Sequence, residues 1–178
     1  MTTEAHKLAA SRGFLTLEDV DLIIELVGIL DRRKNLTVID LGAGSGTTAG
    51  AVFGARQDRV HVYTYDVSPE ALYWAGRFIE NIGRADAWTH VLKDSVLAAE
   101  DWADDSVDLV LLDTSHEYEP TVRELAAWRP KLKRGGYFWC HDYIGDYPGV
   151  AQAIDEAIAR GEFVDGRTAG LGWAGKVS

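Results

Sequence analysis

Aspartates recur at the ends of the apolar segments of this chain, with a spacing that could bring several carboxylates to one edge of a sheet. Asp66, Asp94, Asp113 and Asp142 each end a run of strand-forming residues, and Asp40 lies one residue before the end of another. A carboxylate at the carboxyl end of a strand can accept hydrogen bonds from a ribose diol or ligate a divalent cation. These residues therefore indicate a ligand site.

A glycine-rich turn follows the first of these apolar segments. The segment reads Val38-Ile39-Asp40-Leu41 and continues as Gly42-Ala43-Gly44-Ser45-Gly46-Thr47. Glycine permits positive φ, and its missing Cβ lets a ligand approach the backbone. The helix that follows is expected to begin near residues 45–47, with the hydroxyls of Ser45 and Thr47 as caps. The pattern predicts a strand, a tight turn and a helix, with a nucleotide lying across the turn.

The spacing of the glycines separates two kinds of nucleotide site. A dinucleotide fingerprint has the form G-x-G-x-x-G or A, in which the last small residue lets helix and strand pack closely. Gly42 and Gly44 fit this form, but Thr47 occupies the small position and Gly46 comes one residue early. The turn therefore fits a dinucleotide site poorly.

Two further strand ends carry candidates for nucleotide contacts. Asp66 lies about twenty residues past the glycines, where a carboxylate can bind a ribose, although it could instead cap the helix that starts near Pro69. Asp94 and Ser95 are placed to reach the edge of an adenine ring, and either could equally be the N-cap of the helix from Val96.

Strand and helix patterns alternate along the chain without visible linkers or repeats. Such alternation predicts right-handed crossovers and a mostly parallel sheet covered by helices on both faces. Thr16 and Asp19 are spaced as a helix cap, so the N-terminal segment is expected to form a helix packed on the sheet or, alternatively, a substrate lid. The predicted strands span 36–41, 60–66, 89–94, 107–113 and 137–142, and the predicted later helices span 69–82, 96–102, 120–132 and 150–159.

Composition limits the class of protein. The chain has 178 residues, of which 47% are hydrophobic and 26% charged, as expected for one globular domain. No apolar run approaches the roughly 18 residues of a membrane span, and the N-terminus lacks a signal-peptide pattern. The single cysteine, Cys140, rules out an internal disulfide and suits a cytoplasmic location. The net charge of −10 argues against a nucleic-acid partner.

Two later motifs give the chain a family resemblance. One is D-x-x-H-x-Y, from Asp113 to Tyr118; the other is Gly135-Gly136, a strand, and His141-Asp142-Tyr143. The G-x-G-x-G turn resembles motif I of class I S-adenosylmethionine (SAM) dependent methyltransferases. Together the motifs resemble a bacterial subfamily akin to the macrocin-type O-methyltransferases and cephalosporin-hydroxylase-like proteins, over about residues 36–155.

This resemblance implies an α/β, Rossmann-like fold with a seven-stranded sheet of order 3-2-1-4-5-7-6. It implies one methyltransferase domain over 1–178, consisting of an N-terminal helical segment (1–35), a SAM-binding core (36–160) and an antiparallel C-terminal hairpin (161–178). The implied activity is transfer of a methyl group from SAM to a hydroxyl of a small natural product or saccharide.

The resemblance also implies roles for the strand-end residues. Asp40 and the turn would hold the methionine end of SAM, Asp66 the ribose and Asp94 the adenine. Asp113 and residues ending the fifth strand would bind a divalent cation, and His116 would be the general base. The implied SAM contacts come from Asp40, Gly42, Ala43, Gly44, Ser45, Gly46, Asp66, Val67, Ser68, Asp94 and Ser95.

The chain departs from the family pattern at His141. A carboxylate or amide is expected there, and imidazole nitrogen suits Mn²⁺, Fe²⁺ or Zn²⁺ better than Mg²⁺. His141 could instead be a base, or simply hydrogen-bond near the sheet end. Asp113, His141 and Asp142 are thus the candidate ligands for Mg²⁺ or Mn²⁺, and His116, Asp113 and His141 the candidate catalytic residues.

Other functions stay open from the sequence. The chain could be a SAM-binding scaffold without activity, an NAD-linked oxidoreductase or a metal-dependent hydroxylase. The segment before the first strand is short, which allows three arrangements of the acceptor site. The site could be open, a second subunit of a homo-oligomer could close it, or the substrate could be larger than a sugar.

Overall fold

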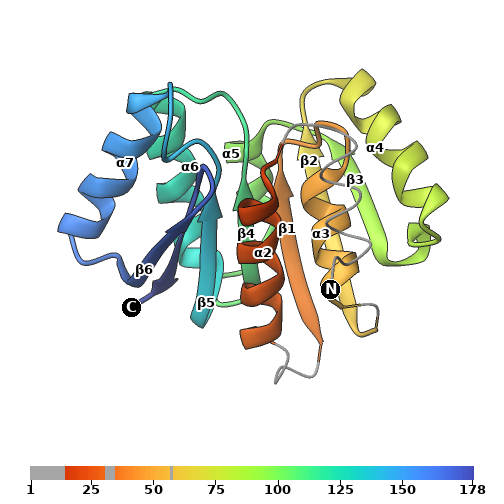
Figure 1. Cartoon of the computed structure of the whole chain (residues 1–178), viewed down its shortest axis with the longest axis horizontal. Helices are drawn as coiled ribbons and strands as arrows, with labels where there is room; N and C mark the ends of the chain where they lie inside the picture. The colour runs from red at the N-terminus through yellow and green to blue at the C-terminus, as the bar shows by residue number, and fades with distance from the viewer. Residues whose placement is uncertain (1–14, 31–34, 57) are drawn as a thin grey trace.

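The computed structural model describes residues 15–30, 35–56 and 58–178. They form one seven-stranded sheet of order β3-β2-β1-β4-β5-β7-β6, as the family resemblance implied (Figure 1). The prediction of a helical segment over 1–35 falls partly outside the described residues, and its described part contains α2 (Leu17–Leu30).

The first five strands are parallel and the last two form an antiparallel hairpin. The parallel strands are β1 (Leu36–Leu41), β2 (Val60–Asp66), β3 (Trp88–Leu92), β4 (Val107–Leu112) and β5 (Leu132–Cys140). The hairpin consists of β6 (Phe163–Ala169) and β7 (Gly172–Val177), and β7 pairs antiparallel with β5. Strand β1 pairs with β2 on one side and with β4 on the other, so the order in which strands are added to the sheet reverses at β1. Ligands of such sheets bind at the carboxyl ends of the strands next to this reversal.

Helices cover both faces of the sheet because neighbouring strand residues point to opposite faces. Val38 packs in one buried cluster with side chains of α2, α3 (Thr47–Ala55) and α4 (Pro69–Asn81). Ile39 packs in the other cluster, with α5 (Ser95–Ala98), α6 (Tyr118–Trp128) and α7 (Pro148–Ala159). The nearly continuous apolar sequence of the strands follows from this burial on both sides.

Several predicted boundaries were wrong. Strand β5 begins at Leu132 rather than at residue 137, because the helix before it ends at Trp128. Gly135 has φ +74°, and the pairing of β4 with β5 shifts between Val107 and Leu109, so the strand passes through an irregularity at the glycine pair. The helix predicted over 96–102 is a short α-helix, α5, followed by one 3₁₀ turn (Ala99–Asp101).

Candidate functional site

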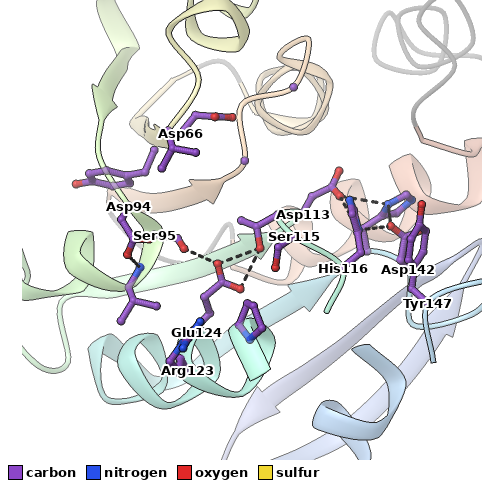
Figure 2. A pocket seen from close by; sticks show the side chains of 18 of the residues that line it. Asp66, Asp94, Ser95, Asp113, Ser115, His116, Arg123, Glu124, Asp142 and Tyr147 are labelled. Carbon is purple, nitrogen blue, oxygen red and sulfur yellow. Dashed lines mark hydrogen bonds and ion pairs between the residues drawn. The ribbon is translucent and has the colours of Figure 1, made fainter. Parts of the chain in front are cut away.

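A cavity of about 1050 Å³ lies at the carboxyl edge of the parallel strands. Its wall is formed by residues that end or follow β1 to β5, together with residues of α6 and the β6–β7 turn (Figure 2). The predicted site residues that line it are Gly42, Gly44, Asp66, Val67, Asp94, Ser95, Asp113, His116, His141 and Asp142.

Gly42 is required by the chain itself. A Cβ atom at this position would lie 1.9 Å from the carbonyl oxygen of Asp113, and the residue has φ +94°. The missing side chain thus lets the ends of β1 and β4 approach each other. From the sequence, we instead expected this glycine to let a ligand approach the backbone. Gly44, with φ +46° and nothing within 4 Å of its Cβ position, does leave open space for a ligand.

The predicted hydroxyl cap of α3 was wrong. The N-cap is Gly46 and no side chain caps the helix, while the hydroxyls of Ser45 and Thr47 hydrogen-bond to each other at 2.9 Å. A Cβ on Gly46 would lie 2.9 Å from Phe78 Cδ1, so this glycine serves the packing of the turn against α4. Ala43 and Ser45 line a small hollow of about 50 Å³ beside the turn.

Asp40 is buried beneath the turn and does not line the main cavity. Its carboxylate accepts hydrogen bonds from the hydroxyls of Thr48 (2.6 Å) and Thr64 (2.9 Å). Burial, and to a smaller extent the charges of Asp113 and Asp66, raise the pKa of Asp40 to about 7, although these two hydrogen bonds act to lower it. In this position Asp40 connects β1, α3 and β2.

Asp66 holds the glycine turn from the end of β2. Its two oxygens accept hydrogen bonds from the backbone N–H groups of Ala43 and Ser68, both at 2.7 Å. The N-cap of α4 is Ser68, whose hydroxyl accepts from the N–H of Ala71, and Ser68 does not line the main cavity. Each oxygen of Asp66 keeps a second lone pair for a ligand at the cavity wall.

Asp94 is the N-cap of α5, which was one of its two predicted roles, and it also lines the cavity. Its Oδ1 accepts hydrogen bonds from the N–H groups of Val96 and Leu97, at 2.9 and 3.0 Å. The adjacent Ser95 hydroxyl donates to Glu124 of α6. Sequence reasoning missed Glu124, which lies 29 positions from Ser95 in the chain. Its buried helical neighbours Leu125 and Trp128 were the available signal.

Four side chains from the ends of β4 and β5 meet at the other end of the cavity (Figure 2). His116 Nδ1 lies 2.6 Å from Asp142 Oδ2 and 4.0 Å from Asp113 Oδ1. His141 Nδ1 lies 3.2 Å from Asp142 Oδ2 and 3.5 Å from Asp113 Oδ1. Three potential ligand atoms, one each from Asp113, His141 and Asp142, lie within 4.8 Å of one another, so these side chains form a candidate cation site.

The backbone at this cluster is held in an uncommon conformation. His116 and Asp142 both have φ +56°, and neither is glycine. Such values cost energy and persist where the surrounding structure enforces them, often at functional sites. They place the two side chains in hydrogen-bond contact, and the ring of Tyr147 packs against His116 with 4.7 Å between ring centroids.

The electrostatics fix the state of the His116–Asp142 pair. The hydrogen bonds from His116 and His141 hold the pKa of Asp142 well below its usual value despite burial, so its carboxylate is ionised and can only accept. His116 Nδ1 must therefore donate, which leaves Nε2 to accept a proton when the ring is neutral. The bond to Asp142 also raises the pKa of His116, although burial acts against it.

His141 is enclosed by carboxylates. Burial acts to lower its pKa, but hydrogen bonding to Asp113, Asp142 and Asp19 raises it well above its usual value. His141 Nε2 lies 3.6 Å from Asp19 Oδ2, and Asp19 is fully buried. Sequence reasoning assigned Asp19 only to a helix cap, which is confirmed by the hydrogen bonds between Thr16 and Asp19.

Comparisons with known proteins agree with the fold. Residues 39–143 match the family model of a methyltransferase domain. A protein of Corynebacterium glutamicum superposes with a TM-score of 0.77 at 17% identity, over 97% of this chain and 87% of its own. A methyltransferase of Geobacter sulfurreducens gives 0.74 at 15% identity, over 97% and 86%. The O-methyltransferase NovP gives 0.74 at 17% identity, over 92% and 81%. No curated protein matches the sequence.

Proposed function

The chain belongs to the methyltransferase domain family and is therefore a SAM-dependent methyltransferase, and from this premise we propose that it methylates a hydroxyl group of a small natural product or saccharide. The observation that carries the choice of a hydroxyl is the His116–Asp142 pair at the cavity wall, joined at 2.6 Å. A hydroxyl is a poor nucleophile near neutral pH, and a histidine whose tautomer is fixed by a carboxylate can take its proton.

The cofactor would lie along the carboxyl edge of the sheet. We place its methionine part at the glycine turn, its ribose at Asp66 and its adenine at the β3 side, near Asp94 and Ser95. In this arrangement Asp40 supports the turn from below. The sulfonium would then lie between the turn and Asp113, facing the two histidines.

Charge at the cavity favours this cofactor over NADH. The lining carries five carboxyl groups but only one lysine and one arginine, Lys93 and Arg123. A sulfonium cation is attracted by such a wall, whereas the pyrophosphate of a dinucleotide is repelled.

A divalent cation fits the cluster at the acceptor end. His141 Nδ1 lies 3.2 and 3.5 Å from one oxygen each of Asp142 and Asp113, near the roughly 3 Å that separates adjacent ligands bound at about 2.1 Å. The mixed nitrogen and oxygen donors suit Mn²⁺, Fe²⁺ or Zn²⁺ better than Mg²⁺. When bound, the cation would orient the acceptor hydroxyl and lower its pKa.

The reaction is an in-line displacement. The acceptor oxygen attacks the methyl carbon as the carbon–sulfur bond breaks, so the positive charge on sulfur is lost and S-adenosylhomocysteine leaves. The proton of the hydroxyl passes to Nε2 of neutral His116, while Asp142 holds the opposite nitrogen. The chain contributes chiefly by fixing the acceptor about 3 Å from the methyl group.

Transfer of labelled methyl from SAM to a panel of phenols, sugars and other alcohols tests the proposal. For an acceptor that is methylated, His116→Ala should lower turnover about 10²- to 10⁴-fold, the usual contribution of a general base, with SAM affinity nearly unchanged. The matched control is His90→Ala, because His90 is exposed on β3 and does not line the cavity.

Three results would contradict the proposal. Normal turnover in His116→Ala would remove the assigned base. SAM binding without transfer to any acceptor would favour a scaffold. Substrate-dependent oxygen consumption with bound iron, and no methyl transfer, would favour a hydroxylase.

A further inference from the structure

The cavity has a polar wall between the end of β3, the end of β4 and α6. Ser95 follows β3 and Thr114 follows β4, and the hydroxyl groups of both hydrogen-bond to Glu124 of α6. Figure 2 shows Glu124 pointing toward Ser95. The proposed ribose position at Asp66 puts the purine of a nucleoside on this side, beyond the ribose and away from the acceptor. Val96 and Pro120 supply apolar surface in the same region of the lining.

The hydrogen bonds of Glu124 leave one of its oxygens with acceptor capacity. Oε1 receives the hydroxyl of Ser95 and lies 2.9 Å from that of Thr114. Oε2 lies 3.0 Å from the same Thr114 hydroxyl. A hydroxyl carries one proton, so Thr114 cannot satisfy both oxygens fully. Oε2 therefore has lone pairs for a donor from the cavity.

Because Glu124 is buried, a hydrogen-bond donor from a ligand would stabilise its carboxylate. Glu124 is only 3% exposed, although it belongs to the cavity wall. Burial raises the pKa of Glu124, while the hydroxyls of Ser95 and Thr114 lower it. Among the ion pairs found in the described part of the chain, none includes Glu124. A ligand N–H at this wall would satisfy the carboxyl group.

We propose that Glu124 Oε2 accepts a hydrogen bond from the exocyclic 6-amino group of the cofactor's adenine and so selects adenine over a 6-oxo purine. This inference rests on the proposed function, because it needs a nucleoside cofactor with its ribose at Asp66. Glu124 is then a specificity-determining residue, whereas Ser95 and Thr114 position its carboxyl group. A 6-oxo group facing Glu124 would place two acceptors together without a proton between them.

The test compares S-adenosylhomocysteine with its inosine analogue, in which a 6-oxo group replaces the 6-amino group. Calorimetric titration of the wild-type protein should show about 10- to 100-fold tighter binding of the adenosine form, as expected for one hydrogen bond to a charged group. Glu124→Gln should abolish or reverse this preference, since its amide can donate to the 6-oxo oxygen while its carbonyl keeps the two hydroxyl contacts.

Two comparisons keep the result interpretable. Glu119→Gln, an exposed position on the same helix, should keep the wild-type preference. The ratio of the two affinities is measured within each variant, so a general loss of folded protein cancels. Should Glu124→Gln fail to fold, Glu124→Asp withdraws the carboxylate by one methylene and should also reduce the preference.

Two outcomes would overturn the inference in distinguishable ways. If Glu124→Gln keeps the wild-type ratio, Glu124 does not select the base, and the proposed function stands. If the wild-type protein binds neither nucleoside, the proposed function fails and this inference fails with it.

Discussion

At the scale of single residues, the proposed chemistry depends chiefly on His116 and Asp142. Their contact depends on the positive φ of both residues, +56° in each, and on the ionised carboxylate of Asp142 beside the His116 ring. The same Asp142 oxygen also contacts His141 at 3.2 Å. Asp142 is therefore shared between His116, the proposed proton acceptor, and the candidate cation site.

The pH dependence of turnover should report this sharing. His116 must be neutral to accept a proton, so kcat/KM, which reports the free enzyme, should rise as pH increases through the pKa of His116, which the hydrogen bond to Asp142 raises above 6.5. Asp142→Asn removes the charge that stabilises the imidazolium, so the acidic limb of the profile should move to lower pH. The plateau should fall about tenfold or more, because the tautomer is no longer fixed.

Asp113→Asn is the matched control for this prediction. Asp113 belongs to the candidate cation site but lies 4.0 Å from His116 Nδ1, so its replacement should move the acidic limb less. Equal shifts in the two variants would mean that the limb reports the cation site and would refute the assignment of His116.

At the scale of elements, Asp19 joins the start of α2 to the β6–β7 turn and to the site. One of its oxygens accepts from the N–H groups of Leu171 and Gly172, at 3.1 and 2.8 Å, and the other accepts from Thr16. The Nε2 atom of His141 lies 3.6 Å from the second of these oxygens, Asp19 Oδ2. The helix cap, the hairpin and the carboxyl end of β5 therefore share one buried charge.

Asp19→Ala should destabilise the fold by about 3 kcal/mol, because it leaves the buried N–H of Gly172 and the part-buried N–H groups of Thr16 and Leu171 without their acceptor. It also leaves His141 without one of its carboxylate neighbours. Chemical denaturation measures the free energy of unfolding. Glu18→Gln in the same helical turn is exposed and should change it by less than about 0.5 kcal/mol. A loss below about 1 kcal/mol in Asp19→Ala would contradict the assigned role.

Local patterns predicted the elements well and the contacts between distant elements poorly. The glycine turn, the strand ends and the Thr16–Asp19 cap are local features, and the structure contains all of them. The meeting of Asp19 with Gly172 joins positions 153 apart, and that of Ser95 with Glu124 joins positions 29 apart. No periodicity encodes such pairs. The strand order came from the family resemblance, since alternation alone does not fix it.

At the scale of the whole molecule, the reversal of strand order at β1 gathers the site from separate parts of the chain. The cavity combines the ends of β1 to β5 with residues of α6, so a bound cofactor would contact the carboxyl ends of all five parallel strands. In the described part of the chain, no helix has the length and apolar character needed to cross a membrane. A cytoplasmic location remains our expectation from the sequence.

The most direct test of this account is calorimetric titration of the protein with SAM and S-adenosylhomocysteine, each with and without Mg²⁺ or Mn²⁺, and with NADH as control. We predict binding of both sulfur nucleotides with Kd of about 1–100 μM, no binding of NADH, and a response to Mn²⁺ that His141→Ala abolishes. Absence of a Mn²⁺ response would contradict only the proposed cation site. Failure of both sulfur nucleotides to bind would contradict the central claim that this cavity holds SAM.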